Sequence, residues 1–238
     1  MRIATWNLER KKPTSLRGAE ALDYLYARDA DVFVVTEARN TMPTSGGHML
    51  FSPAPGSPWL APDERKVALW SREEIEPVHF DIRIDESRFV AGRTETPIGS
   101  LLVVGVCITW HMAGVGERAG RVSKPWEQHL AYLENLAVIF ASIDEPFVVA
   151  GDFNQRYPRV KGSNKAASQA LADTFTGIEI VTAGIPDGCI KPGIDHIAVS
   201  AGLEAFDVAG WPNDATGNRM SDHDGSIASV RRSASRRR

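Results

Sequence analysis

Residues 146–154 read Pro-Phe-Val-Val-Ala-Gly-Asp-Phe-Asn, which is the most specific local pattern in the chain. The apolar part, 146–150, has the length and the Val-rich composition of a buried strand. Gly151 permits a sharp exit from that strand. Asp152 and Asn154 lie two positions apart, so in an extended segment their side chains point to the same side. The stretch therefore predicts a buried strand that delivers a carboxylate and an amide to one edge of a sheet.

Other short apolar runs in the chain have the same character and are bounded by turn residues. These predicted strands are 2–6, 31–36, 66–71, 100–109, 193–200 and 226–230. A helix is predicted from Pro125 onward, where apolar residues recur every three or four positions through Phe140, and a weaker one over about 15–28. The weaker helix has its apolar side on Leu16, Ala19, Leu22 and Tyr26. The alternation predicts an α/β fold, with the Pro-rich segment 42–62 as an irregular loop.

The length and composition indicate one domain. The chain has 238 residues, of which 43% are hydrophobic, so it can bury a large core. We expect a single domain over 1–230, followed by a disordered basic tail over 231–238 that cannot bury apolar surface. The tail is either an ordinary solvated end or a weak electrostatic contact for a polyanion.

Charge and cysteine content narrow the functional classes. The net charge is −3, which lacks the basic surplus of a dedicated nucleic-acid binder. Two cysteines are too few for a disulfide framework, which favours a reducing compartment. No stretch reaches the length of 18 apolar residues that indicates a membrane helix. We therefore expect a cytoplasmic monomer without a membrane span.

Polar residues follow the predicted strands at the points where the strands end. They are Asn7, Glu37, His111, Asp152, Asn154, Asp195, Asp222 and His223. Alone, each fits a bland interpretation: Asn7 is typical of a turn, and a single histidine such as His111 is typical of a structural hydrogen bond. Together they match phosphate-ester hydrolysis, because carboxylates hold a hard cation and a histidine activates water. His223, with Asp195 fixing its tautomer, fits the base.

This ordered set resembles the endonuclease/exonuclease/phosphatase superfamily, which includes pancreatic-type deoxyribonucleases, apurinic/apyrimidinic endonucleases, neutral sphingomyelinases and inositol polyphosphate 5-phosphatases. The resemblance runs in order from Thr5-Trp6-Asn7 through Gly-Asp-Phe-Asn to Ser221-Asp222-His223, which is nearly the whole chain. It implies a two-sheet, four-layer α/β sandwich with the helices outside and the catalytic site at one edge of the sheets.

The resemblance also implies a metal site for Mg²⁺ or Mn²⁺. Glu37 would be the principal ligand, with Asn7 and Asp222 close to the metal. No organic cofactor is implied.

The catalytic roles implied by the resemblance fall on five residues. His223 would be the base held by Asp195, Asp152 and Asn154 would position the water and the phosphate, and His111 would bind or protonate the phosphoryl group. Glu64 is a candidate acidic partner for His111. His196 would point to the opposite face of its strand from Asp195 and is interpreted as structural.

The substrate remains open between two enzymatic alternatives. The favoured one is a phosphodiester, in nucleic acid or in a small molecule; the other is a phosphomonoester of a sugar, inositol or nucleotide. The basic segment 114–124, with Arg118, Arg121 and Lys124, either meets a phosphate or is a solvated loop. A scaffold protein that has lost catalysis is disfavoured because all the expected polar positions are present. A Rossmann-type cofactor binder is excluded because no Gly-x-Gly-x-x-Gly follows a strand.

Overall fold

The computed structural model describes residues 1–81, 83–116 and 123–234. Its elements, in chain order, are β1 (Arg2–Asn7), α1 (Leu16–Tyr26), β2 (Val32–Arg39), β3 (His48–Phe51), β4 (Glu64–Ser71), β5 (Ile75–Pro77), the short 3₁₀ helix η1 (Glu86–Arg88), β6 (Phe89–Thr94), β7 (Leu101–Cys107), α2 (Glu127–Ala141), β8 (Phe147–Asp152), α3 (Lys165–Thr174), β9 (Ile178–Ile180), β10 (Asp195–Ser200), β11 (Leu203–Trp211) and β12 (Gly225–Arg232).

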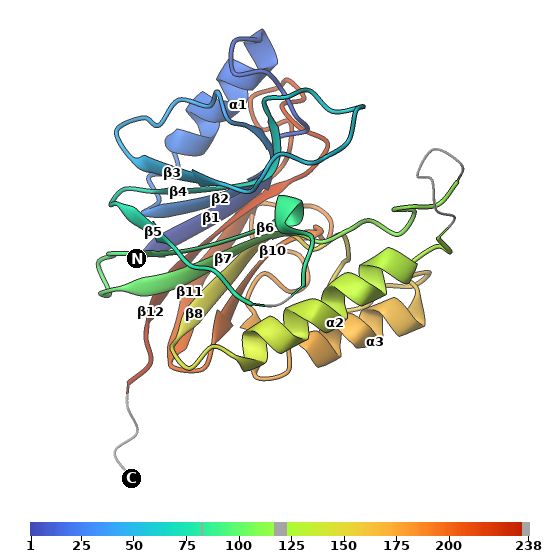
Figure 1. Ribbon diagram of the computed structural model, residues 1–238. Helices are drawn as coiled ribbons and strands as arrows, with labels where there is room; N and C mark the ends of the chain where they lie inside the picture. Colours follow the sequence, from blue (N-terminus) through green and yellow to red (C-terminus); the bar gives the residue numbers. More distant parts are fainter. Residues whose placement is uncertain (82, 117–122, 235–238) are drawn as a thin grey trace.

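The strands form two six-stranded sheets that pack face to face. One has the order β11-β12-β1-β2-β4-β3 and the other β5-β6-β7-β8-β10-β9. Helix α1 covers the outer face of the first sheet, and α2 and α3 cover that of the second (Figure 1). The predicted four-layer α/β sandwich is confirmed.

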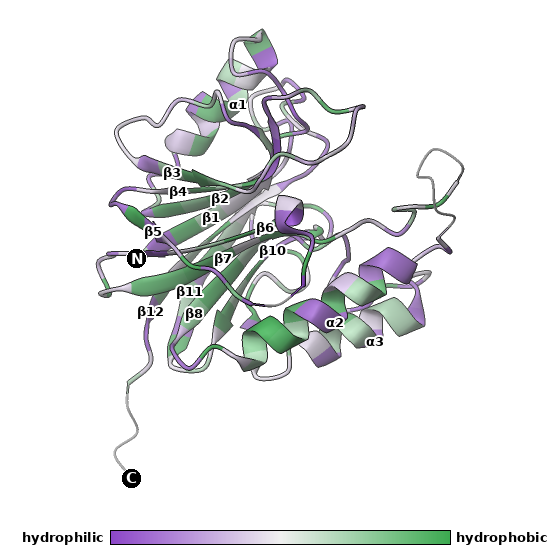
Figure 2. Ribbon diagram, in the orientation of Figure 1, coloured by the Kyte–Doolittle hydropathy of each residue, from purple (hydrophilic) through white to green (hydrophobic). Residues whose placement is uncertain are grey.

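Alternating side chains of the central strands serve two different cores. In β2, Val32 and Val34 face the second sheet, whereas Phe33 and Val35 pack under α1. Because both faces of each sheet are covered, the strands read as continuous apolar runs, which dominate both sheets in Figure 2. Gly105 marks the close approach of the two sheets, since a Cβ there would lie 2.8 Å from a methyl group of Val67.

The predicted strands are all present, but several elements have no counterpart in the sequence analysis. These are the strands β3, β5, β6, β9 and β11 and the helix α3. The prediction of an irregular loop over 42–62 was therefore wrong at β3, which pairs with β4 at the sheet edge. The strands β3, β5 and β9 are sheet edges of at most four residues and lack a long apolar run, whereas β6 lies inside its sheet.

Two further predictions about element boundaries need correction. The buried residues of α1 are Gly18, Ala21, Leu22 and Leu25, and the side chain of Leu16 is 86% exposed, so the helix faces the sheet one position away from the expected side. Strand β12 continues through Arg232, so the tail does not begin at 231. Arg231 pairs with Glu204, and Arg232 donates to the carbonyl of Ser100. Residues 235–238, together with Arg118 and Arg121 of the basic segment, lie outside the described residues.

No helix in the described ranges combines the length and the apolar character that crossing a membrane would require.

Candidate active site

The topology brings the polar strand ends to one edge of the sandwich. Strand β1 ends at Asn7 and its parallel neighbour β2 contains Glu37, while β8 ends at Asp152 in the second sheet. Strand β10 runs antiparallel to β8 and begins at Asp195, which is the register partner of Asp152. Gly151 is required before Asp152, since its φ is +137° and a Cβ would lie 1.9 Å from the carbonyl oxygen of Val106.

His223 and Asp195 form a short, partly buried hydrogen bond at the centre of the site. The imidazole Nδ1 lies 2.5 Å from Asp195 Oδ2, and the two side chains are 14% and 2% exposed. This bond fixes Nδ1 as the protonated nitrogen and leaves Nε2 to face reactants. Burial lowers the pKa of His223, but the charge of Asp195 and its hydrogen bond outweigh that effect and raise the pKa to about 10.

The loop that carries His223 is tied to the end of β1 by two hydrogen bonds. The indole Nε1 of Trp6 donates to the carbonyl of His223 at 2.8 Å, and the hydroxyl of Ser221 donates to the carbonyl of Asn7 at 2.5 Å. The Ser221 hydroxyl also accepts from the backbone N–H of His223. Both side chains therefore position the Ser-Asp-His segment on the sheet.

Asp152 is buried between polar neighbours from three elements. Its Oδ2 accepts from the amide of Asn7 at 3.2 Å, and its Oδ1 accepts from the backbone N–H of Asn154 at 2.8 Å. Burial and the nearby Asp195 raise the pKa of Asp152 to about 7. Asn154 has a left-handed backbone with φ +54°, and its amide donates to the carbonyl of Ile108, which orients it at the strand exit.

Glu37 stands in an uncommon backbone conformation and meets two cations. Its φ is +47°, and such strain in a residue with a side chain is found chiefly at functional sites. Lys66 Nζ lies 2.9 Å from Oε1 and Arg10 Nε lies 3.4 Å from Oε2. Burial acts to raise the pKa of Glu37, but these two cations lower it overall, so the carboxylate is charged.

The donor set fits a hard divalent cation. One ligand atom each from Asp152, Asp195 and His223 lies within 4.8 Å of the others. Asp195 Oδ1 is buried and has no hydrogen-bond partner among the described residues, as expected for a carboxylate oxygen that can ligate a cation. Asp222, which is 45% exposed, adds a carboxylate oxygen 3.8 Å from His223 Nε2. Oxygen donors of this kind suit Mg²⁺ or Mn²⁺.

This candidate cluster of Asp152, Asp195 and His223 shares no residue with the metal ligands expected from the sequence, which are Glu37, Asn7 and Asp222. Asn7 and Asp222 contact the cluster through Asp152 and His223, respectively, whereas Glu37 is paired with Lys66 and Arg10.

His111 lies beside this cluster rather than within its network of hydrogen bonds. Its ring is exposed, lies 5.4 Å from the rings of Trp110 and Trp126, and lines a cavity together with Asn154. Glu64, the candidate partner, instead accepts from Arg39 at 3.2 Å, so that pairing is not formed.

His196 is buried on the opposite face of β10 from Asp195, as expected. It donates from Nε2 to the carbonyl of Gln155 and accepts at Nδ1 from Thr182. Burial lowers its pKa to about 4, so it is neutral.

Sequence reasoning missed Lys66, Trp6 and Ser221 as parts of the site. Lys66 stands within a strand whose other central residues are apolar. That position is itself a signal, because a buried lysine requires a partner. The roles of Trp6 and Ser221 arise from tertiary hydrogen bonds across more than 200 residues, for which a single sequence holds no signal.

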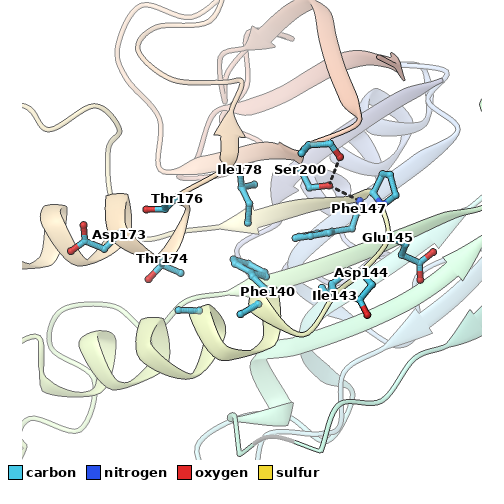
Figure 3. A pocket seen from close by; sticks show the side chains of 15 residues that line it. Phe140, Ile143, Asp144, Glu145, Phe147, Asp173, Thr174, Thr176, Ile178 and Ser200 are labelled. Atoms are coloured by element: carbon cyan, nitrogen blue, oxygen red, sulfur yellow. Dashed lines mark hydrogen bonds between the residues drawn. The ribbon is translucent and has the colours of Figure 1, made fainter. Parts of the chain in front are cut away.

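A second hollow of about 530 Å³ lies at the far ends of β8 and β10, away from this site (Figure 3). Its lining includes Asp144, Glu145 and Asp173 around apolar side chains such as Phe140 and Phe147. No lysine or arginine occurs among its described lining residues. It is therefore unsuited to a phosphate.

Comparisons with known proteins agree with this geometry. The family model described as "Endonuclease/Exonuclease/phosphatase family" matches residues 4–223. No curated protein sequence matches the chain.

Three solved structures illustrate the shared fold. An AP endonuclease from Archaeoglobus fulgidus is 18% identical, with 96% of this chain and 98% of that chain covered and a TM-score of 0.72. A 3′ phosphatase, NExo, from Neisseria bound to product DNA hairpin is 19% identical over 96% and 98%, with a TM-score of 0.68. The human Nocturnin catalytic domain with bound sulfate anion is 16% identical over 98% and 94%, with a TM-score of 0.69.

Proposed function

Because the chain belongs to the endonuclease/exonuclease/phosphatase family, whose members are metal-dependent enzymes that hydrolyse phosphoester bonds, we propose that it cleaves a phosphodiester with His223 as the base. The observation that carries this proposal is the His223–Asp195 pair, joined at 2.5 Å inside a cluster of carboxylates. A neutral imidazole accepts the proton of water, and the carboxylate on its other nitrogen stabilises the imidazolium that forms.

His223 must be neutral to accept a proton at Nε2. The carboxylates that raise its pKa to about 10 include Asp152 and Asp222, which also belong to the group proposed to hold the cation. A cation held by these carboxylates would offset their negative charge and would thereby lower the pKa of His223. Asp195 keeps the ring oriented in both states.

The other polar residues hold the reactants. Asp152 and Asn154 position the attacking water and the phosphate, and His111 binds or protonates the phosphoryl group from the cavity side. Asn7 orients Asp152 through its amide. Glu37, Asn7 and Asp222, with the carboxylates of Asp152 and Asp195, would hold the cation, which leaves Nε2 of His223 free to accept a proton. When bound, the cation supplies positive charge to the phosphoryl oxygens and to the leaving oxygen.

A phosphodiester is favoured over a phosphomonoester by the space beside the site. A cavity of about 380 Å³ is lined by Asn154, two residues after Asp152, and by Ile194, which directly precedes Asp195. This volume can receive a second ester substituent, which a monoester lacks.

A substrate panel with Mn²⁺ or Mg²⁺ tests the proposal. We expect hydrolysis of bis-p-nitrophenyl phosphate and of an oligonucleotide, slower hydrolysis of p-nitrophenyl phosphate, and loss of both activities in excess EDTA with recovery on re-addition of metal. His223→Ala serves as the blank for contaminating hydrolases. Release of phosphate from monoesters at a higher kcat/KM than any diester would overturn the phosphodiester assignment.

A further inference from the structure

We propose that the cavity beside the catalytic cluster binds an unpaired nucleotide unit, with its base against Trp126 and its phosphate near Arg156 and Lys161. The inference rests on the proposed function, since it names the substrate class of that same site.

The cavity adjoins the catalytic strand ends directly. Its lining includes Asn154, whose backbone N–H donates to Asp152, and Ile194, which immediately precedes Asp195. The carbonyl of Ile194 accepts from the backbone N–H of Phe153, so the two strand ends are joined to each other. A ligand in the cavity therefore lies next to the reacting phosphate.

One wall of the cavity is aromatic. Trp126 and His111 both line it, with their ring centroids 5.4 Å apart and their planes tilted by 36°. The backbone of Trp126 has φ +72°, a conformation that is costly for a bulky residue, and its N–H donates to the carbonyl of His111 at 2.7 Å. Trp126 also packs edge to face on the buried His129. The indole is thus held at the cavity by the backbone and by neighbouring rings.

Two cationic side chains also line the cavity. Arg156 and Lys161 line the cavity, and its described lining residues include no aspartate or glutamate. Arg156 donates from Nε to the carbonyl of Pro192, which links its loop to the segment before β10. The hollow in Figure 3 has a lining of the opposite charge, with three carboxylates. A dianionic or monoanionic phosphate is therefore attracted to the cavity beside the active site and repelled from the distant hollow.

The shape and chemistry select a nucleotide. A cavity of about 380 Å³ receives one small organic group but not a double helix. Tryptophan faces stack on any base, whereas inositol and simple sugars offer no aromatic face. The combination of an aromatic wall and two cations therefore favours a single-stranded or extruded nucleotide over an inositol phosphate.

Binding of two matched ligands tests this inference. AMP and ribose 5-phosphate differ only in the base, and titration calorimetry in EDTA measures their affinities without turnover. We expect AMP to bind about fivefold to 150-fold more tightly, the range that stacking of one base contributes. Trp126→Leu should remove this difference and leave ribose 5-phosphate unchanged, and Arg156→Gln should weaken both ligands.

Matched controls lie outside the cavity. Trp59→Leu removes an exposed tryptophan, and Lys165→Gln removes a cation just beyond the cavity residues 160–164; both should bind AMP like the unchanged protein. Equal affinity for AMP and ribose 5-phosphate in the unchanged protein would overturn the inference, even if Trp126→Leu does not fold. If the protein cleaves bis-p-nitrophenyl phosphate with metal but binds AMP no more tightly than ribose 5-phosphate, only this inference is refuted. If it binds AMP more tightly but hydrolyses no phosphodiester, the proposed function is refuted.

Discussion

Lys66 is the residue whose replacement tests the electrostatics of the site most sharply. Its ammonium lies 2.9 Å from Glu37 Oε1, and the two side chains are 11% and 19% exposed. At an effective dielectric constant of about 20, two unit charges about 4 Å apart interact by about 4 kcal/mol. A cation bound at Glu37 must therefore compete with Lys66 and tolerate its like charge. Because the flexible lysine can move away when a cation binds, removing it should add only part of this energy to the binding of Mn²⁺. We expect Lys66→Met to strengthen Mn²⁺ binding at least tenfold, or about 1.4 kcal/mol.

Titration calorimetry with Mn²⁺ measures this effect without requiring activity. Lys165→Met, at an exposed position on α3, is the matched control and should bind Mn²⁺ like the unchanged protein. Arg10→Gln should have a smaller effect than Lys66→Met, since Arg10 is 43% exposed and its charge is screened. Unchanged or weaker Mn²⁺ binding by a correctly folded Lys66→Met protein would refute this reasoning.

Three other predictions concern the metal, the buried histidine and the end of the chain. Glu37→Ala should weaken Mn²⁺ binding at least about tenfold, the lower range for residues around metal sites; unchanged affinity in the same titration would remove Glu37 from the ligand set. His196 has a pKa of about 4 in the folded protein against 6.5 in the unfolded chain. Its contribution to the free energy of unfolding is therefore fully present above pH 6.5 and is lost as the pH falls toward 4. Between pH 7 and pH 4.5 the unchanged protein should therefore lose about 2.5 kcal/mol more stability than His196→Asn in urea unfolding, and parallel losses would contradict this. Ending the chain at Val230 removes the contacts of Arg231 and Arg232 and should lower the Tm by about 2 °C or more, whereas ending it at Ala234 keeps both contacts and should not. Hydrolysis of a small phosphodiester should be unchanged in both truncated proteins, and equal Tm values would show that the end of β12 adds no stability.

The central strands could be predicted because each is buried on both faces. Runs such as 146–150 carry apolar side chains at every position, and that signal needs no partner to be recognised. Edge strands such as β3 bury little, and their pairing depends on neighbours distant in sequence. In α1, the buried face includes Gly18, whose missing Cβ leaves room for the carbonyl of Lys12; a search for large apolar residues does not detect such a contact.

The candidate site could be predicted in part because its residues follow predictable strands. Asn7, Asp152 and Asp195 each lie at the end of a central strand, and the sheet topology brings them together. The pairing of Glu37 with Lys66 depends on the antiparallel neighbour β4 and on the left-handed backbone at Glu37, neither of which a single sequence specifies. The same limit applies to Trp126, which falls within the helix predicted from Pro125 onward but precedes α2 in the structure and lines a cavity.

The measurement that tests the central claim most directly is kcat as a function of pH for His223→Ala and the unchanged protein on a phosphodiester, at saturating Mn²⁺. Loss of a general base typically costs about 10² to 10⁴ in rate. We therefore expect kcat to fall by that factor and the acidic limb of the profile to disappear, while Mn²⁺ affinity changes little and the fold is kept. A folded His223→Ala enzyme within about threefold of the unchanged protein, with its acidic limb intact, would contradict the base role of His223.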